Sequence, residues 1–145
     1  MASLSPDEVE EIVELRIALE TLLVARAIPR LTEEDFAAAQ KIISKLDKTR
    51  TMNDQLTLNI EFHGCLYAKA GRPRTLALYD KLRLAFEPYL RLLWARSDYK
   101  SHSQADHRRI LALCKERDVK SAQSVLAEHI TKTGKEIFQL LERGR

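Results

Sequence analysis

The chain has 145 residues, of which 31% are charged and 45% hydrophobic, with only four glycines and four prolines, a composition typical of one soluble helical domain. The net charge is only +3 and the lysines and arginines are dispersed among acids, which excludes the clustered basic surface of a DNA-binding domain. There is neither a run of about 18 apolar residues nor a basic-then-apolar start, so we expect a cytoplasmic protein without membrane contact.

The first predicted helix has a well-marked beginning. Ser5 is a suitable N-cap, Pro6 occupies the first helical position, and Glu8 lies three residues after the cap, where it completes a capping box. We therefore expect residues 1–5 to be a tail that is either disordered or an artificial addition to the natural sequence. Residues 6–145 are expected to form one domain, since no repeat, low-complexity stretch or linker divides them. Apolar positions wrap more than one face of the first helix, which predicts two packing neighbours.

Apolar periodicity, caps, glycines and prolines together predict six helices. They run over about 6–28, 33–47, 52–69, 73–96, 103–115 and 119–141. Pro88 falls inside the fourth helix, and because proline removes a backbone hydrogen bond and clashes one turn back, we expect a kink there. No segment alternates like a strand, and the connections are short. The predicted fold is all-α, an antiparallel bundle of six helices.

Three of the four histidines lie on the apolar faces of three different predicted helices. His63, His107 and His129 each have aliphatic neighbours at the helical spacings i, i+3, i+4 or i+7. One such histidine is commonly a hydrogen-bonded core residue, but three together favour a metal site, which would leave a divalent ion open to water or an organic ligand. No HExxH or CxxC pair fixes the distances between them. The fourth, His102, falls in a polar stretch that we predict to be an exposed loop.

Several separated motifs resemble those of one known family. Asn59 lies one turn before His63, which places an amide oxygen and an imidazole on one helical face. The motifs are ELRIALE at 14–20, NIEFH at 59–63, AGRP at 70–73 and DHRRILALCKERDVKSAQSVLAEHI at 106–130. They resemble the C-terminal effector-binding domain, often called FCD, of the FadR-type branch of GntR transcriptional regulators, over about 11–141. Six helices instead of seven resemble the VanR-type version of this domain.

The resemblance implies a metal site. The family uses an aspartate from its DxxFH motif and three histidines, and His63, His107 and His129 match those histidines. The position of the aspartate is Asn59 in this chain, and asparagine can coordinate through its carbonyl oxygen but supplies no charge. We therefore expect a divalent ion, with zinc, nickel and manganese as the candidate metals, bound more weakly than by relatives that keep the aspartate.

The resemblance also implies an effector that is a small organic acid, with its carboxylate on the metal. Four neutral ligands leave the double charge of the ion uncompensated, and that charge favours an anion. Arg16 resembles the family arginine that reaches the same cavity, and guanidinium groups pair well with carboxylates. Alternatively, Arg16 pairs with Glu20 on the helix surface. Arg83 and Arg91, two turns apart on the fourth helix, are further effector-binding candidates.

The function implied by the resemblance is ligand sensing and dimerisation within a bacterial transcription regulator, with binding instead of turnover, so we do not expect an enzyme. Relatives carry a winged helix-turn-helix ahead of this domain, and no segment here resembles it, so DNA binding is expected only through a domain absent from this chain. One alternative is a three-histidine metalloenzyme, a hydrolase or hydratase, for which Glu61 and Asp106 are poorly aimed general bases. The other is a metal-free helical adaptor.

Overall fold

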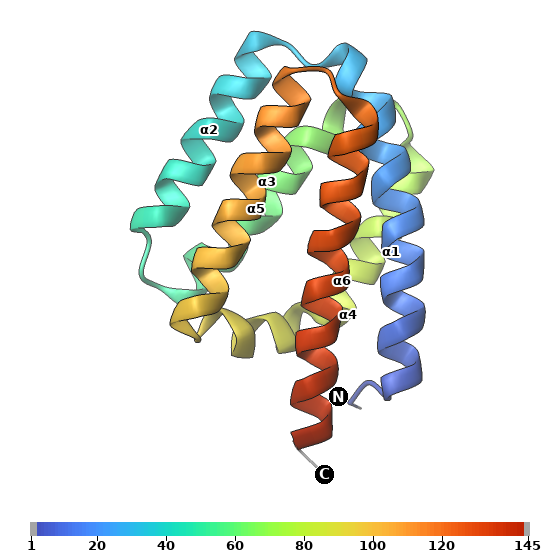
Figure 1. The fold of residues 1–145 in the computed structure, drawn as a ribbon, viewed down its shortest axis with the longest axis vertical. Coiled ribbons are helices and arrows are strands. Elements are labelled where there is room, and N and C mark those ends of the chain that lie inside the picture. Colours follow the sequence, from blue (N-terminus) through green and yellow to red (C-terminus); the bar gives the residue numbers. More distant parts are fainter. Residues whose placement is uncertain (1–2, 144–145) are drawn as a thin grey trace.

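The structure, a computed structural model, describes residues 3–143 as a bundle of helices. The six α-helices are α1 (Pro6–Ala27), α2 (Glu33–Lys48), α3 (Met52–Tyr67), α4 (Pro73–Trp94), α5 (Ser97–Lys115) and α6 (Val119–Arg143), and two short 3-10 helices are η1 (Ile28–Arg30) and η2 (Ala68–Ala70). Successive α-helices run in opposite directions (Figure 1), and no strand occurs between residues 3 and 143. The predicted all-α, six-helix antiparallel fold is confirmed.

The beginning of α1 follows the predicted cap. The Ser5 hydroxyl accepts from the Glu8 amide at 3.1 Å, and the Glu8 carboxylate accepts from the Ser5 amide at 3.0 Å. The Leu4 amide donates to the Tyr89 hydroxyl at 2.7 Å. The segment 1–5 was expected to be a tail, and its first two residues lie outside the part of the chain that the structure describes. Leu4 and Ser5, in contrast, are tied to the bundle by these hydrogen bonds.

The start of α5 differs from the prediction. The helix begins at Ser97, earlier than expected, so His102 lies exposed on a helix and not in a loop. The stretch is polar and lacks the apolar periodicity that marks a helix. Its stability comes instead from Lys100, Gln104 and Arg108, which are spaced one turn apart and all bond to the C-terminal end of α2. Tertiary contacts of this kind override a weak local signal.

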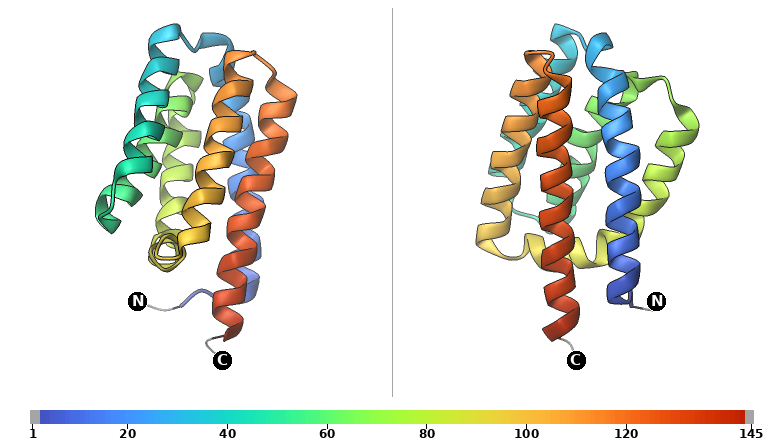
Figure 2. Two further views of the ribbon diagram at one scale, coloured as in Figure 1. Left: turned by 60° about the vertical axis from the view of Figure 1, so that its left-hand side comes forward. Right: turned by 45° about the vertical axis from the view of Figure 1, so that its right-hand side comes forward.

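The path of α4 agrees with the kink expected at Pro88. Pro88 lies within the helix, and Figure 2 shows that α4 changes direction along its length, so that its second half crosses the lower end of the bundle. That half contributes Phe86 and Trp94, both buried, to a small apolar cluster with residues of α1, α5 and α6. A larger apolar cluster fills the rest of the interior, and α1 packs against both α6 and α4. Within residues 3–143, none of the helices combines the length and apolarity that a membrane crossing requires.

The closest approach of α1 and α6 is at Gly134, and this contact generates a stability prediction. A Cβ built on Gly134 would overlap the Cγ2 atom of Val13, whereas one built on Gly64 would meet no atom within 4 Å. Gly134→Ala should therefore lower the melting temperature, because overpacking costs about 1–3 kcal/mol and outweighs the roughly 1 kcal/mol gained from the better helix former. Gly64→Ala should raise it. Thermal unfolding of both variants tests this pair, and equal shifts would contradict the close contact.

Candidate metal centre

The three inward-facing histidines meet at the centre of the bundle. His63 comes from α3, His107 from α5 and His129 from α6, and one ligand atom of each lies within 4.8 Å of the others. The distances between ring centroids are 5.2 Å for His63 and His107, 5.4 Å for His107 and His129, and 5.7 Å for His63 and His129. All three side chains are buried. The structure thus brings together three histidines whose mutual distances could not be predicted from their spacing in the sequence.

Two of these rings are held by hydrogen bonds at Nδ1. His107 Nδ1 lies 2.8 Å from the Gln104 Oε1 atom, and His129 Nδ1 lies 3.0 Å from the Asp106 Oδ2 atom. Burial acts to raise the pKa of Asp106, but the hydrogen bond from His129 and the charge of Lys132 outweigh it and leave that pKa lowered. Asp106 is therefore a carboxylate that accepts the Nδ1 proton of His129. Metal-binding histidines typically use their second nitrogen in this way, which keeps Nε2 free for the ion.

Several buried polar atoms of the predicted metal-binding residues have no hydrogen-bond partner in the described part of the chain. Within the described part of the chain, Asn59 Oδ1, His63 Nδ1 and His107 Nε2 are buried and have no hydrogen-bond partner. A buried polar atom without a partner costs about 1–3 kcal/mol. An amide oxygen and neutral imidazole nitrogens are ligands suited to zinc, nickel or manganese. The residues present fit a divalent metal ion.

Burial also keeps the imidazoles in the form that a metal requires. It lowers the pKa of His63 well below the ordinary value, and the charges of His129 and Arg16 lower it further. It likewise lowers the pKa of His107 well below the ordinary value, with added effects from His63 and His129. His63 and His107 are therefore neutral at neutral pH, and neutral imidazoles bind metal without first losing a proton.

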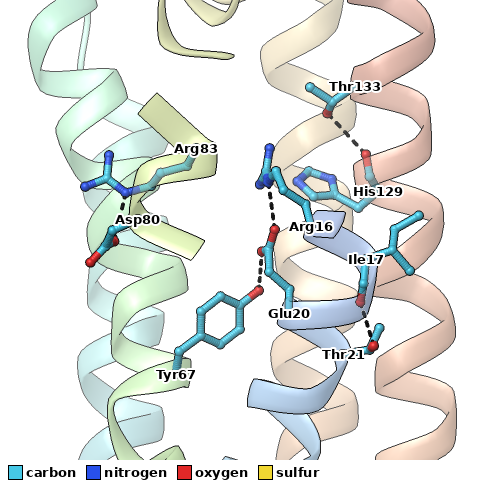
Figure 3. Close-up of polar contacts among 9 residues, drawn as sticks. All are labelled: Arg16, Ile17, Glu20, Thr21, Tyr67, Asp80, Arg83, His129 and Thr133. Atoms are coloured by element: carbon cyan, nitrogen blue, oxygen red, sulfur yellow. Dashed lines mark hydrogen bonds and ion pairs between the residues drawn. The ribbon is translucent and has the colours of Figure 1, made fainter. Parts of the chain in front are cut away.

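Arg16 forms a buried pair with Glu20 beside the histidines. Its Nε donates to Glu20 Oε2 at 2.8 Å, and the Tyr67 hydroxyl donates to Glu20 Oε1 at 2.6 Å (Figure 3). The guanidinium carbon lies 6.0 Å from the ring centroid of Tyr79 and 5.5 Å from that of Phe86. The pairing that the sequence offered as a surface contact therefore exists, but it lies in the interior. Both carboxylate oxygens of Glu20 are used, so this buried charge is fully hydrogen-bonded.

A small cavity connects Arg16 with the metal centre. Its volume is about 30 Å³, and it is lined by Arg16, Leu56, Asn59, Ile60, His63, Tyr79, Arg83, Glu87 and Leu90. Of the two further arginine candidates, Arg83 lines the cavity. Arg91 does not: its Nη1 donates to Asn53 Oδ1 at 2.9 Å, its Nη2 lies 3.6 Å from Glu87, and its side chain is 46% exposed. The structure therefore places Arg83, and not Arg91, beside the predicted site.

Two polar residues of this centre were not identified from the sequence. Gln104 lies three residues before His107, and Glu87 lies four residues after Arg83, so helical spacing alone places each on the face of a candidate residue. This helical spacing is too weak a signal to single out either side chain, because polar residues at such spacings are common on solvated helix faces.

The buried histidines predict how the stability of the metal-free protein depends on pH. In the unfolded chain they take up protons near pH 6.5, whereas folded His63 and His107 stay neutral, so the free energy of unfolding should fall as the pH drops below that value. The loss should reach up to about 1.4 kcal/mol per pH unit for each histidine. Urea unfolding of the protein in the presence of a chelator, between about pH 5.5 and 7.5, measures this change in the free energy of unfolding. His107→Leu should flatten the dependence, and the exposed control His102→Gln should not; an unchanged slope in His107→Leu would contradict the assignment.

Comparisons with known proteins identify the family of this chain. The family model described as the FCD domain matches residues 11–132. The HTH-type transcriptional regulator McbR of Escherichia coli (strain K12) is 26% identical over 127 residues, which cover 83% of this chain and 57% of McbR. The chain therefore spans little more than half of that relative.

The fold of this chain is similar to that of solved structures of GntR-family regulators. A GntR-family transcriptional regulator from Pseudomonas syringae pv. tomato superposes with a TM-score of 0.84 at 27% identity, over 99% of this chain and 61% of that protein. E. coli McbR superposes with a TM-score of 0.87 at 22% identity, over 97% of this chain and 72% of that one. These relatives are transcription regulators and not enzymes. The family match and the shared helical architecture show that this chain belongs to the FCD domain family, the effector-binding domains of GntR-family transcriptional regulators.

Proposed function

We propose that this domain senses a small organic acid through a divalent metal ion held by Asn59, His63, His107 and His129, as the dimeric effector-binding part of a cytoplasmic bacterial transcription regulator. One observation carries the proposal: three buried imidazoles from three helices converge within 4.8 Å. Among the predicted ligands, three buried acceptor atoms lack hydrogen-bond partners, and coordination would satisfy them. Zinc, nickel and manganese are the candidate metals.

The charge balance of the site supports an anionic effector. All four proposed metal ligands are neutral, so the double charge of the ion is not compensated by its own ligands. Two unit charges about 4 Å apart attract by about 4 kcal/mol at an effective dielectric constant of 20. Arg16 and Arg83 also line the cavity, but Glu20 and Asp80 already pair with them, so the uncompensated charge is that of the ion. A carboxylate that binds the ion and accepts from Arg16 would balance that charge.

The size of the cavity implies that binding moves side chains. A volume of about 30 Å³ has room for roughly two water molecules and not for an organic acid. Arg83 and Glu87 are the cavity residues best placed to move, because their side chains are 21% and 34% exposed. Both lie on α4, one turn apart. We propose that the effector enters by displacing these two side chains.

The rival enzymatic function has little support in the geometry. A three-histidine hydrolase needs a base beside the metal-bound water. Asp106 instead accepts from Nδ1 of His129, on the edge of the ring away from Nε2, and Glu61 is exposed. A metal-free adaptor is disfavoured by the unpartnered atoms of the ligand set. The family and its matched relatives are regulators, so sensing is the function that we propose.

The metal centre is tested by titrating zinc, nickel and manganese into metal-free protein. At least one of them should bind with one ion per chain and raise the melting temperature, because a hundredfold excess over the dissociation constant adds about 2.7 kcal/mol to the free energy of unfolding. His129→Ala should weaken binding at least about tenfold. Asn59→Asp adds a charged ligand and should tighten it. His102→Ala is the matched control, since it removes an exposed histidine. Melting that is insensitive to chelator, with full metal content in His129→Ala, would contradict the proposal.

The effector role of Arg16 is tested with acetate, pyruvate, succinate and citrate as probes on the metal-loaded protein. At least one should raise the melting temperature. The double variant Arg16→Met with Glu20→Gln removes both charges of the buried pair, so it avoids leaving one uncompensated. It should weaken the carboxylate response about tenfold or more, with metal content unchanged. Arg74→Met, at an exposed position of α4 that does not line the cavity, should respond like the wild type; a full response in the double variant would exclude Arg16 from the effector site.

A homodimer is proposed from the apolar residues exposed on two adjacent helices. Leu15 and Leu22 on α1 are 45% and 40% exposed, and Leu78 and Leu92 on α4 are 54% and 56% exposed. Exposed apolar surface of this kind marks interfaces, and a symmetric dimer uses one surface twice. Light scattering should give a dimer mass, and Leu15→Glu with Leu78→Glu should give a monomer. Phe138→Glu on α6 is the control. A monomeric wild type at high concentration would contradict the proposal.

A further inference from the structure

Gln104 connects the metal centre to the C-terminal end of α2. It lies on α5 one turn before His107, and its side chain is buried. Its amide nitrogen donates to the Ile43 carbonyl oxygen at 2.9 Å and to Asp47 Oδ1 at 2.8 Å, both on α2. Its amide oxygen lies 2.8 Å from His107 Nδ1. One side-chain amide makes all three contacts, so it is held by α2 on its nitrogen side and faces His107 on its oxygen side.

The orientation of this amide decides where His107 carries its proton. A backbone carbonyl and a carboxylate can only accept, so α2 requires the NH₂ group of Gln104 on its side. The amide oxygen is left facing His107, and an oxygen without a hydrogen cannot donate. Nδ1 must therefore be the protonated nitrogen of the neutral ring. The other nitrogen, Nε2, then keeps a lone pair, and this is the buried atom of His107 that has no partner in residues 3–143.

We propose that Gln104 is a positioning residue that presets His107 as the Nδ1–H tautomer, with Nε2 ready to bind the metal, and that α2 enforces this choice through Ile43 and Asp47. The inference rests on the proposed metal function. The Nδ1 atom of His107 thus has a neutral amide as its hydrogen-bond partner, whereas the partner of His129 Nδ1 is the carboxylate of Asp106.

The arrangement also couples metal binding to helix packing. A metal on Nε2 draws electron density from the ring and strengthens the Nδ1–H donor, so it strengthens the hydrogen bond to Gln104. Gln104 is one of three side chains of α5, with Lys100 and Arg108, that bond to the C-terminal end of α2. Lys100 lies one turn earlier and donates to the Thr49 carbonyl at 2.9 Å without touching a histidine. It therefore offers a matched control.

The test measures tautomer and affinity separately, on the full chain. Nitrogen-15 NMR of the metal-free protein should show His107 protonated at Nδ1. Gln104→Met keeps the length of the side chain but removes its acceptor, so the ring should lose this single tautomer and zinc affinity should fall about 10- to 100-fold. Lys100→Met should keep the tautomer, and its zinc affinity should stay within about twofold of the wild type.

A second variant covers the case in which Gln104→Met does not fold. Combining Gln104→Glu with Asp47→Asn gives up the bond to the Ile43 carbonyl, but position 47 now donates to position 104, which still accepts from His107. This variant should keep the Nδ1–H tautomer and a zinc affinity above that of Gln104→Met. A metal-free wild type protonated at Nε2, or Gln104→Met with wild-type zinc affinity, would overturn the inference. Absence of zinc, nickel and manganese binding in the wild type would overturn the metal function, while the tautomer would still decide the role of Gln104.

Discussion

The structure depends on one constraint: three imidazoles face one another inside the bundle, and two of them, His63 and His107, must stay uncharged there. A proton on either of these two would place a positive charge next to two other rings in the buried interior. The fold meets this constraint by bringing three helices together at one fixed register. Buried ring nitrogens without a hydrogen-bond partner are costly, and His63 Nδ1 and His107 Nε2 are two such atoms.

The second buried feature is the ion pair of Arg16 and Glu20. An isolated buried charge costs several kcal/mol, and here each partner offsets the other while Tyr67 completes the coordination of the carboxylate. The guanidinium remains next to the cavity because its Nε is held by a residue one turn along the same helix. The position of the Arg16 guanidinium is thus fixed within α1, independently of the more exposed side chains on α4.

Much of this molecule could be predicted from the sequence because its signals are local. Capping residues, short connections and apolar spacing indicate the helices, and the same spacing turns the histidines inward. The start of α5 could not be predicted, since its first turn is stabilised by bonds to α2 and not by apolar periodicity. Nor could the sequence separate Arg83 from Arg91: spacing assigns both to one face, and only the structure shows that Arg83 lines the cavity while Arg91 contacts Asn53 and Glu87.

The close contact between Gly134 and Val13 has a consequence for the spacing of two helices. Val13 lies one turn before Arg16 on α1, and Gly134 lies just over one turn after His129 on α6, so the helices meet near both residues of the site. Because glycine has no Cβ atom, the two backbones approach here to a separation that any other residue at position 134 would prevent. The distance between α1 and α6, and with it the placement of Arg16 relative to His129, therefore depends on a missing side chain.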